Sequence, residues 1–189
     1  MPWDDERFER FLEATIRMAK GQLPGYGYPH VVFPYQPTEE RTCIERLRGL
    51  PPRLAGAGLS ATVIPVARQV AHALKRFATR PLERPDEYDR LQSDLSAPTR
   101  GIAVKAAEGC VKGIIALPTR PGVIVLGRLG ALYPFAHVST FLEALHQAFQ
   151  ESGTSPTVAV AYPGTAEGTR LRFLGLVDPT GGYRGHVVT

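Results

Sequence analysis

The stretch VIVLGRLGALYPFAHVSTFLEALHQAF, residues 123–149, decides the fold. Together with Gly122, its first five residues carry no polar side chain, as in a central strand of a parallel sheet that helices cover on both faces. Two glycines and Tyr-Pro-Phe follow, and residues 136–149 then place apolar side chains at helical spacing. The stretch therefore predicts a strand–loop–helix unit of an α/β protein.

The same alternation extends along the chain in both directions. Further strands are predicted at 30–35, 60–66, 157–164, 170–174 and 183–188, and further helices at 4–20, 38–48, 67–78, 86–95 and 99–117. Thr38 is the expected N-cap of its helix, and Pro65 is expected at the end or edge of its strand because proline cannot donate to a ladder. We predict an α/β fold: a three-layer, mainly parallel sheet of four to five strands flanked by helices, with an N-terminal helical extension.

Length and composition favour a single core. The 189 residues are 43% hydrophobic, which suffices for one sizeable core but not for two comfortable domains. We predict a helix and linker over residues 1–28, packed on a single α/β domain over residues 29–189. The chain has no apolar run long enough for a membrane span, and its acidic start is unlike a secretory leader, so a cytoplasmic location is expected. Cys43 and Cys110 are expected to be free thiols.

The predicted helix at 99–117 is nearly all apolar. Lys105, Glu108 and Lys112 form its one polar stripe, at positions i, i+3 and i+7. Gly109 and Gly113 each cost roughly 1 kcal/mol against alanine within a helix. We therefore expect a close approach to the sheet or to another helix to offset this cost.

The basic excess belongs to one part of the chain. The formal net charge is +4, and residues 41–80 hold eight Arg or Lys against Glu45 alone. Such a stretch suits nucleic acid or an acidic protein surface, and a solvated helix face explains it equally well. For the nucleic-acid alternative the candidate residues are Arg41, Arg46, Arg48, Arg53, Arg68, Lys75 and Arg76.

Motifs for catalysis and nucleotide binding are missing. The loop GRLGALYPF lacks the Lys and the Ser or Thr of a P-loop, and the pattern G-x-G-x-x-G does not occur. The nucleophile pattern G-x-S-x-G is also absent, and the histidines and carboxylates are not clustered in the sequence. We therefore expect that the chain is not an enzyme and that it binds neither a cofactor nor a metal ion. The remaining aromatic, proline and basic residues are typical of a protein–protein interface.

Two segments carry a family resemblance. GVIVLGRLGALYPFAHVSTFLEAL and TVAVAYPGTAEGTRLRFLGLVDPTGGYRGHVV resemble the BrxB family of bacteriophage-exclusion (BREX) systems. The shared features are Leu-Tyr-Pro-Phe after a glycine-containing loop, a strand that ends in Tyr-Pro-Gly, then Leu-x-Phe-Leu-Gly and a final Tyr-Arg. The segment PHVVFPYQPTEERTCIERLRGL is similar to the front of the family, so the resemblance covers about residues 29–188. This chain departs from the family at Gly127-Arg128, where Thr-Gly is usual, and at Gly182-Tyr183, where an aromatic pair is usual.

The resemblance implies a non-enzymatic accessory or adaptor subunit of a BREX anti-phage defence complex. The implied partner is the PglZ-like protein, with the DNA methyltransferase and the large ATPase as further components. The motif residues in loops form the implied partner-binding set: Leu132, Tyr133, Pro134, Phe135, Tyr162, Pro163, Gly164, Thr165, Tyr183 and Arg184. Alternatively, Pro134, Pro163 and Gly164 only shape turns. Two other functions remain open: a nucleic-acid-binding accessory protein that uses residues 41–80, and an enzyme or nucleotide binder at the strand ends.

Overall fold

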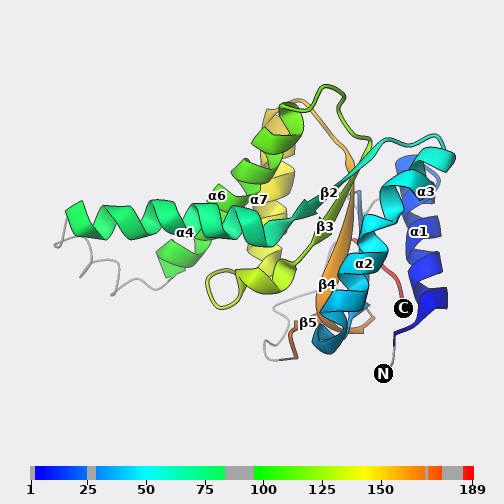
Figure 1. Cartoon of the computed structure of the whole chain (residues 1–189), viewed down its shortest axis with the longest axis horizontal. Helices are drawn as coiled ribbons and strands as arrows, with labels where there is room; N and C mark the ends of the chain where they lie inside the picture. Colours follow the sequence, from blue (N-terminus) through cyan, green and yellow to red (C-terminus); the bar gives the residue numbers. More distant parts are fainter. Residues whose placement is uncertain (1–2, 25–28, 84–95, 169, 176–184) are drawn as a thin grey trace.

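A six-stranded sheet lies between two layers of helices (Figure 1). The computed structural model describes residues 3–24, 29–83, 96–168, 170–175 and 185–189. The strands are β1 (His30–Tyr35), β2 (Ala61–Pro65), β3 (Val123–Gly127), β4 (Thr157–Glu167), β5 (Arg170–Phe173) and β6 (His186–Val187). The order across the sheet is β2-β3-β4-β1-β6, and β5 pairs with β4. The predicted α/β class and three-layer arrangement are confirmed.

The central strands are buried along their length, which explains why their sequences are apolar at successive positions. All residues of β1 and β3 are buried, and so are the first eight of β4. β1 pairs in parallel with β4 on one side and with β6 on the other. β2 pairs in parallel with β3 at one edge, where Pro65 stands at the strand's end as predicted. β5 is the antiparallel strand, and it folds back on the extension of β4.

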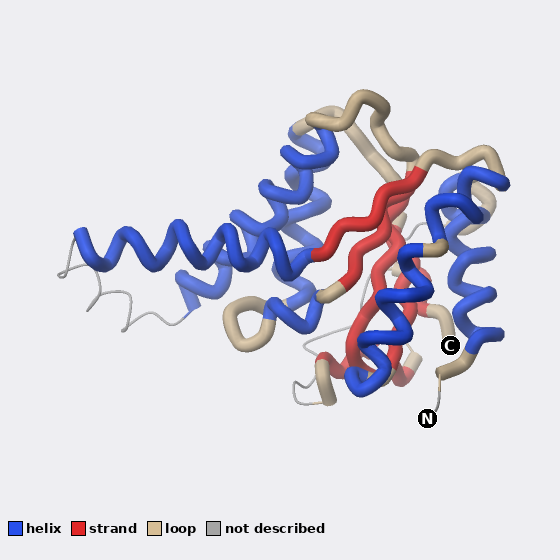
Figure 2. Tube along the Cα trace, in the orientation of Figure 1, coloured by secondary structure: helices blue, strands red, loops and turns tan. Residues whose placement is uncertain are grey.

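Each face of the sheet is covered by its own set of helices (Figure 2). One face carries α1 (Asp5–Ala19), α2 (Glu40–Arg48) and α3 (Leu50–Gly56), and the other carries α4 (Val66–Glu83), α6 (Ser96–Ile115) and α7 (Val138–Glu151). The side chains of β1 divide between two cores accordingly: Val31 and Phe33 face α1, while Val32 faces the α4–α6–α7 side. Two short 3-10 turns, η1 (Pro37–Glu39) and η2 (Leu129–Leu132), follow β1 and β3.

Helix α1 docks on the sheet through aromatic side chains. Asp4 caps it by accepting a hydrogen bond from the Arg7 amide at 2.9 Å. Its apolar stripe buries Phe8 and Phe11, whose rings lie 5.5 and 5.4 Å from the ring of Phe33 on β1. The Arg7 guanidinium completes this contact, because it lies 5.0 Å from the Phe33 ring centre and donates to the Pro34 carbonyl.

Three local expectations need correction or completion. Thr38 does not cap a helix: Pro37 begins the 3-10 turn η1, and Glu39 occupies the N-cap of α2 without a side-chain cap bond. Helix α4 continues to Glu83, beyond the predicted end at residue 78. The predicted strand at 183–188 is described only at His186–Val187, and the predicted helix at 86–95 lies outside the described residues.

The glycines of α6 differ in their surroundings. A Cβ added at Gly109 would lie 2.5 Å from Oε1 of Gln69, so α4 does approach α6 closely at this point. Gly113 has no atom within 4 Å of the same position and faces open space. The expected close approach is therefore found at Gly109 but not at Gly113.

Candidate functional site

The carboxyl ends of the parallel strands form the edge where open α/β sheets usually bind ligands. Here the extension of β4 and its hairpin with β5 stand at that edge. A Cβ added at Gly130 would lie 3.9 Å from Pro163 and 4.0 Å from Leu174, so the loop after β3 packs against the hairpin. Leu129 and Leu132 of this loop are fully buried. The glycine-containing loop thus has a packing role that explains its small residues.

The departure from the family at Gly127-Arg128 has a local explanation. A Cβ at Gly127 would approach Cδ1 of Leu47 to 2.9 Å, so any larger residue would require the Leu47 side chain to shift where α2 crosses β3. Arg128 adopts φ 60° and ψ 37°, the left-handed conformation that glycine tolerates best. The usual Thr-Gly pair would relieve the backbone at residue 128 but would crowd Leu47.

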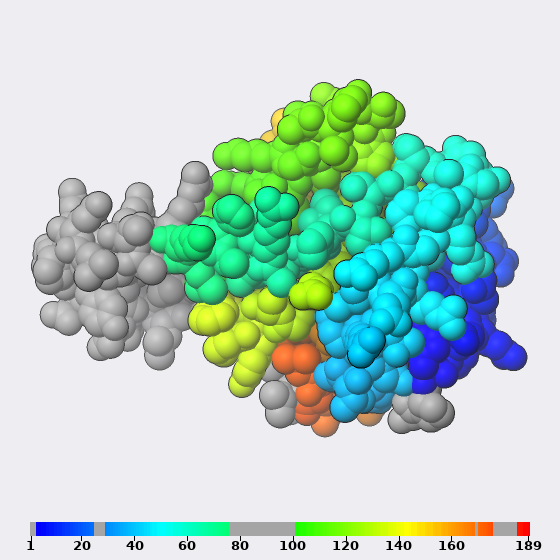
Figure 3. Space-filling view, viewed as in Figure 1, coloured from blue at the N-terminus to red at the C-terminus, as the bar shows by residue number. Residues whose placement is uncertain are grey.

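Two aromatic side chains project from the segment between η2 and α7. Tyr133 is 46% exposed and Phe135 is 38% exposed, and Pro134 between them is exposed as well. The Ala136 amide donates to the Leu132 carbonyl at 2.7 Å, which closes the backbone around these three residues. We call residues 133–135 the aromatic loop. The segment that contains it reaches the surface below α4 in the space-filling view (Figure 3).

The other residues of the implied partner-binding set lie in different environments. Leu132, Tyr162, Pro163 and Gly164 are buried, and Thr165 is exposed on β4. Tyr183 and Arg184 lie outside the described residues. Among the described members, only Tyr133, Pro134, Phe135 and Thr165 can therefore touch a partner without a rearrangement.

The buried members of this set support the β4–β5 hairpin. The ring of Tyr162 packs edge-on against Phe173 of β5, with centroids 5.6 Å apart. Gly164 pairs with Phe173, and a Cβ at Gly164 would lie 2.1 Å from the Arg172 carbonyl oxygen. Gly164 therefore allows the close pairing of β4 with β5, and its role in partner binding stays a prediction.

The basic residues of the 41–80 stretch divide between the two faces of the molecule. Arg41, Arg46, Arg48 and Arg53 are exposed on α2 and α3. Three of them form ion pairs: Arg41 with Glu45 at 3.2 Å, Arg46 with Asp5 at 2.9 Å, and Arg53 with Glu9 at 2.8 Å. The hydrogen bond from Arg53 lowers the pKa of the Glu9 carboxyl below its usual value. The acidic residues of α1 thus neutralise much of the neighbouring basic stretch.

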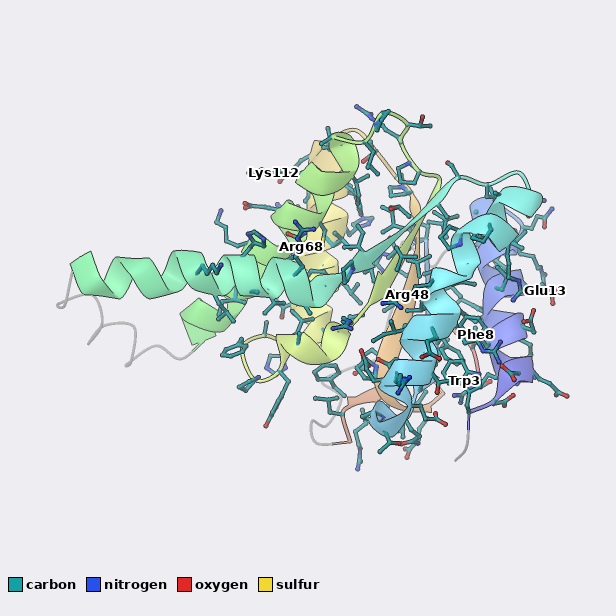
Figure 4. All side chains as sticks on the ribbon, in the orientation of Figure 1. Trp3, Phe8, Glu13, Arg48, Arg68 and Lys112 are labelled. Atoms are coloured by element: carbon teal, nitrogen blue, oxygen red, sulfur yellow. The ribbon has the colours of Figure 1, made fainter. Side chains whose placement is uncertain are left out.

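On the opposite face, α4 and α6 enclose an open groove with a volume of about 570 Å³. Its basic side chains are Arg68 and Lys75 of α4 and Lys105 and Lys112 of α6. Arg68 and Lys112 lie on the same side of the molecule in Figure 4. The sequence places Arg68 and Lys75 among the candidate basic residues but misses the two lysines of α6, whose i, i+7 spacing is the only signal. The side chain of Arg76 is not described.

Both cysteines are free and buried. Burial raises the pKa of the Cys110 thiol to about 12, and burial together with the nearby Glu40 and Glu39 carboxylates raises the pKa of Cys43. Both thiols therefore stay protonated at neutral pH, which makes them weak nucleophiles. The Tyr35 hydroxyl, buried near Cys43, donates a hydrogen bond to the Glu40 carboxylate and so ties β1 to the start of α2.

Two histidines that are far apart in the sequence meet at the amino ends of the strands. The His30 and His146 rings have centroids 6.3 Å apart, beside a small cavity of about 50 Å³. Burial and the nearby His146 lower the pKa of His30 to about 4. The described residues contain no cluster of three or more metal-ligating side chains, here or elsewhere.

We expect acid to destabilise the fold through His30. The unfolded chain binds a proton near pH 6.5, whereas the folded chain resists it down to about pH 4. The contribution of neutral His30 to the free energy of unfolding is therefore fully present above about pH 6.5. About 2–3 kcal/mol of it is lost as the pH falls to about 4.5. Urea denaturation at pH 7.5 and 4.5 measures this loss. His30→Gln should show a smaller loss over the same interval, and an equal loss would remove His30 as the cause.

Comparison with known proteins gives one significant match. The family model for BREX protein BrxB matches residues 86–188, a segment that includes α6, β3, η2, α7, β4, β5 and β6. The chain belongs to the BrxB family. Membership implies a role in BREX phage defence and confirms the family resemblance over residues 86–188, whereas the similarity of the front segment stays a prediction. No curated protein and no solved structure shows a significant match.

The BrxB segment contains the aromatic loop, the β4–β5 hairpin and one wall of the basic groove. Helices α1 to α4, with β1 and β2, lie before it and complete the sheet. Over the described part of the chain, none of the helices is both long enough and apolar enough to cross a lipid bilayer.

Proposed function

We propose that this BrxB-family chain is a non-enzymatic accessory subunit of a BREX defence complex, and that it binds the PglZ-like protein through the aromatic loop. The observation that carries the proposal is the exposure of Tyr133 and Phe135 on a backbone that is already held in place. Aromatic side chains are enriched in the cores of protein interfaces, where they bury large areas. The cytoplasmic location expected from the sequence is part of the proposal.

The anchoring of the loop favours this reading. Leu132 and Ala136 are buried on either side of the exposed residues, and the Tyr133 amide donates to the Gly130 carbonyl at 3.1 Å. A surface held in this way loses little conformational entropy when a partner docks, so more of the contact energy appears as affinity. The protonated thiols and the packed glycine-containing loop support the absence of catalysis.

The test is co-purification with the neighbouring operon proteins. The tagged chain is expressed with them, captured in the presence of nuclease and washed at high salt. We expect the PglZ-like protein to remain bound. The double variant Tyr133→Ala, Phe135→Ala should lose it, because two central aromatic anchors are each worth about 2 kcal/mol or more.

The matched control is the double variant Ile115→Ala, Leu117→Ala. These side chains are 43% and 38% exposed, close to the aromatic pair, but they lie at and just beyond the carboxyl end of α6. The control should retain the PglZ-like protein. Equal loss in both double variants, or retention in both, would contradict the proposed surface. Capture of only the methyltransferase or the ATPase would contradict the proposed partner.

A further inference from the structure

We propose that the groove between α4 and α6 binds the sugar–phosphate backbone of a nucleic-acid duplex. This surface and this ligand are distinct from the aromatic loop and its protein partner. The groove is lined by Arg68, Gln69, His72, Ala73 and Lys75 of α4 and by Lys105, Glu108, Gly109, Lys112 and Gly113 of α6.

The spacing of the cations suits a regular polyanion. Arg68 and Lys75 are seven residues apart on α4, and Lys105 and Lys112 are seven apart on α6. Seven residues are about two helical turns, so each helix presents two cations about 10 Å apart along the groove. All four side chains are exposed. Two rows of cations therefore face the space between the helices, and they can contact several phosphates of one duplex.

Two of the four cations in this groove, Arg68 and Lys112, carry charge that no described carboxylate balances. Glu108 is its one carboxylate, and it pairs with Lys105 at 2.9 Å. Arg68 and Lys112 form no ion pair with any side chain in the described ranges. The arginines of α2 and α3 differ, since Asp5 and Glu9 of α1 neutralise two of them. Three of the four exposed arginines of α2 and α3 are paired, so among the described residues the α4–α6 groove keeps more unpaired basic charge.

The lining favours phosphate over an acidic peptide or unpaired bases. The groove has no Phe, Tyr or Trp and no large apolar side chain; His72 is its one ring, and its smallest lining residues are Ala73, Gly109 and Gly113. A bound peptide would need apolar or aromatic pockets for its anchors, and unpaired bases would need aromatic rings for stacking. A duplex backbone needs only cations and polar donors, which Gln69 and His72 add to the four basic residues.

The test is binding of a fluorescent DNA duplex of about 20 base pairs to the full chain, over a series of salt concentrations. Each phosphate contact contributes about 0.9 to the slope of log affinity against log salt. We expect Arg68→Gln with Lys112→Gln to weaken binding at least tenfold at low salt and to make the slope shallower by about 2. Glu108→Gln should tighten binding, because it removes the carboxylate beside the cations.

The control is Arg46→Gln with Arg53→Gln, which changes the net charge equally on the opposite face. We expect this variant to bind within about twofold of the native chain. Equal losses in the two double variants would show general charge attraction and would overturn the proposal, as would no duplex binding at low salt. Displacement of the duplex by polyglutamate as readily as by unlabelled duplex would assign the groove to an acidic polypeptide instead.

Two further experiments identify the type of nucleic acid and distinguish this inference from the proposed function. A double-stranded RNA and a single strand of the same length are compared with the DNA duplex. Either duplex should bind more tightly than the single strand, and a preference for the single strand would overturn the duplex assignment. Arg68→Gln with Lys112→Gln should still capture the PglZ-like protein in nuclease-treated lysate. If the chain fails to capture the PglZ-like protein, the groove proposal still stands. If the chain fails to bind a duplex, the proposed function of the aromatic loop still stands.

Discussion

Replacing Phe33 by alanine is expected to lower the free energy of unfolding by about 3–5 kcal/mol. Phe33 is fully buried at the centre of the sheet face that α1 covers. The rings of Trp3, Phe8 and Phe11 surround it, with centroids 5.4–5.5 Å away. Alanine removes the ring that all three contact and leaves a cavity, and it also leaves the Arg7 guanidinium without its aromatic partner.

The control is Phe135→Ala, which makes the same chemical change at an exposed site. We expect it to alter stability by less than about 0.5 kcal/mol. Urea denaturation of both variants, with slopes compared to the native chain, separates a true loss of stability from a change in the unfolded state. Equal effects of the two substitutions would mean that α1 is not anchored through Phe33.

Replacing Gly164 by alanine is expected to cost about 3 kcal/mol and to open the β4–β5 hairpin. The new Cβ would lie 2.1 Å from the Arg172 carbonyl oxygen and 3.0 Å from the Tyr162 ring. The first of these is a backbone atom of the paired strand, so it can move only if the pairing breaks. Gly164 also has φ +156°, a conformation that L residues rarely adopt.

The matched control lies in the same hairpin. Gly168 has φ +61° but no atom within 4 Å of an added Cβ, so Gly168→Ala bears backbone strain without a clash. We expect it to cost about 1 kcal/mol. Thermal unfolding measures both costs, and hydrogen exchange of the β5 amides shows whether the hairpin has opened. Similar costs at both glycines would show that strand contact is not what selects glycine at residue 164.

The alternation of strands and helices was predictable because it is encoded locally. Residues 122–127 are apolar on both faces, which already required helices above and below the strand. Gly109 likewise predicted a close contact with another element, and Gln69 of α4 makes that contact. Thr38 failed as a cap because Pro37 can begin a helical turn one residue earlier, and sequence spacing does not decide between the two starts.

The candidate sites were less predictable because they depend on which elements meet. Leu132 precedes three exposed loop residues and Tyr162 lies within β4, and both side chains are buried in the core. The ion pairs of Arg46 and Arg53 join residues more than forty positions apart, so the basic stretch could not be seen to be neutralised. Lys105 and Lys112 were recognised as a polar stripe, but only the crossing of α4 over α6 makes them part of a groove.

The strand order also bears on synthesis. β1 leaves the ribosome well before its two neighbours in the sheet, β4 and β6. Until β4 is made, Val31, Val32 and Phe33 have no strand beside them, and the pairing that eventually covers them closes a loop of more than a hundred residues. Such pairings slow folding and leave apolar edges open meanwhile. The nascent chain therefore has a long interval in which a chaperone or an early partner can protect its future sheet centre.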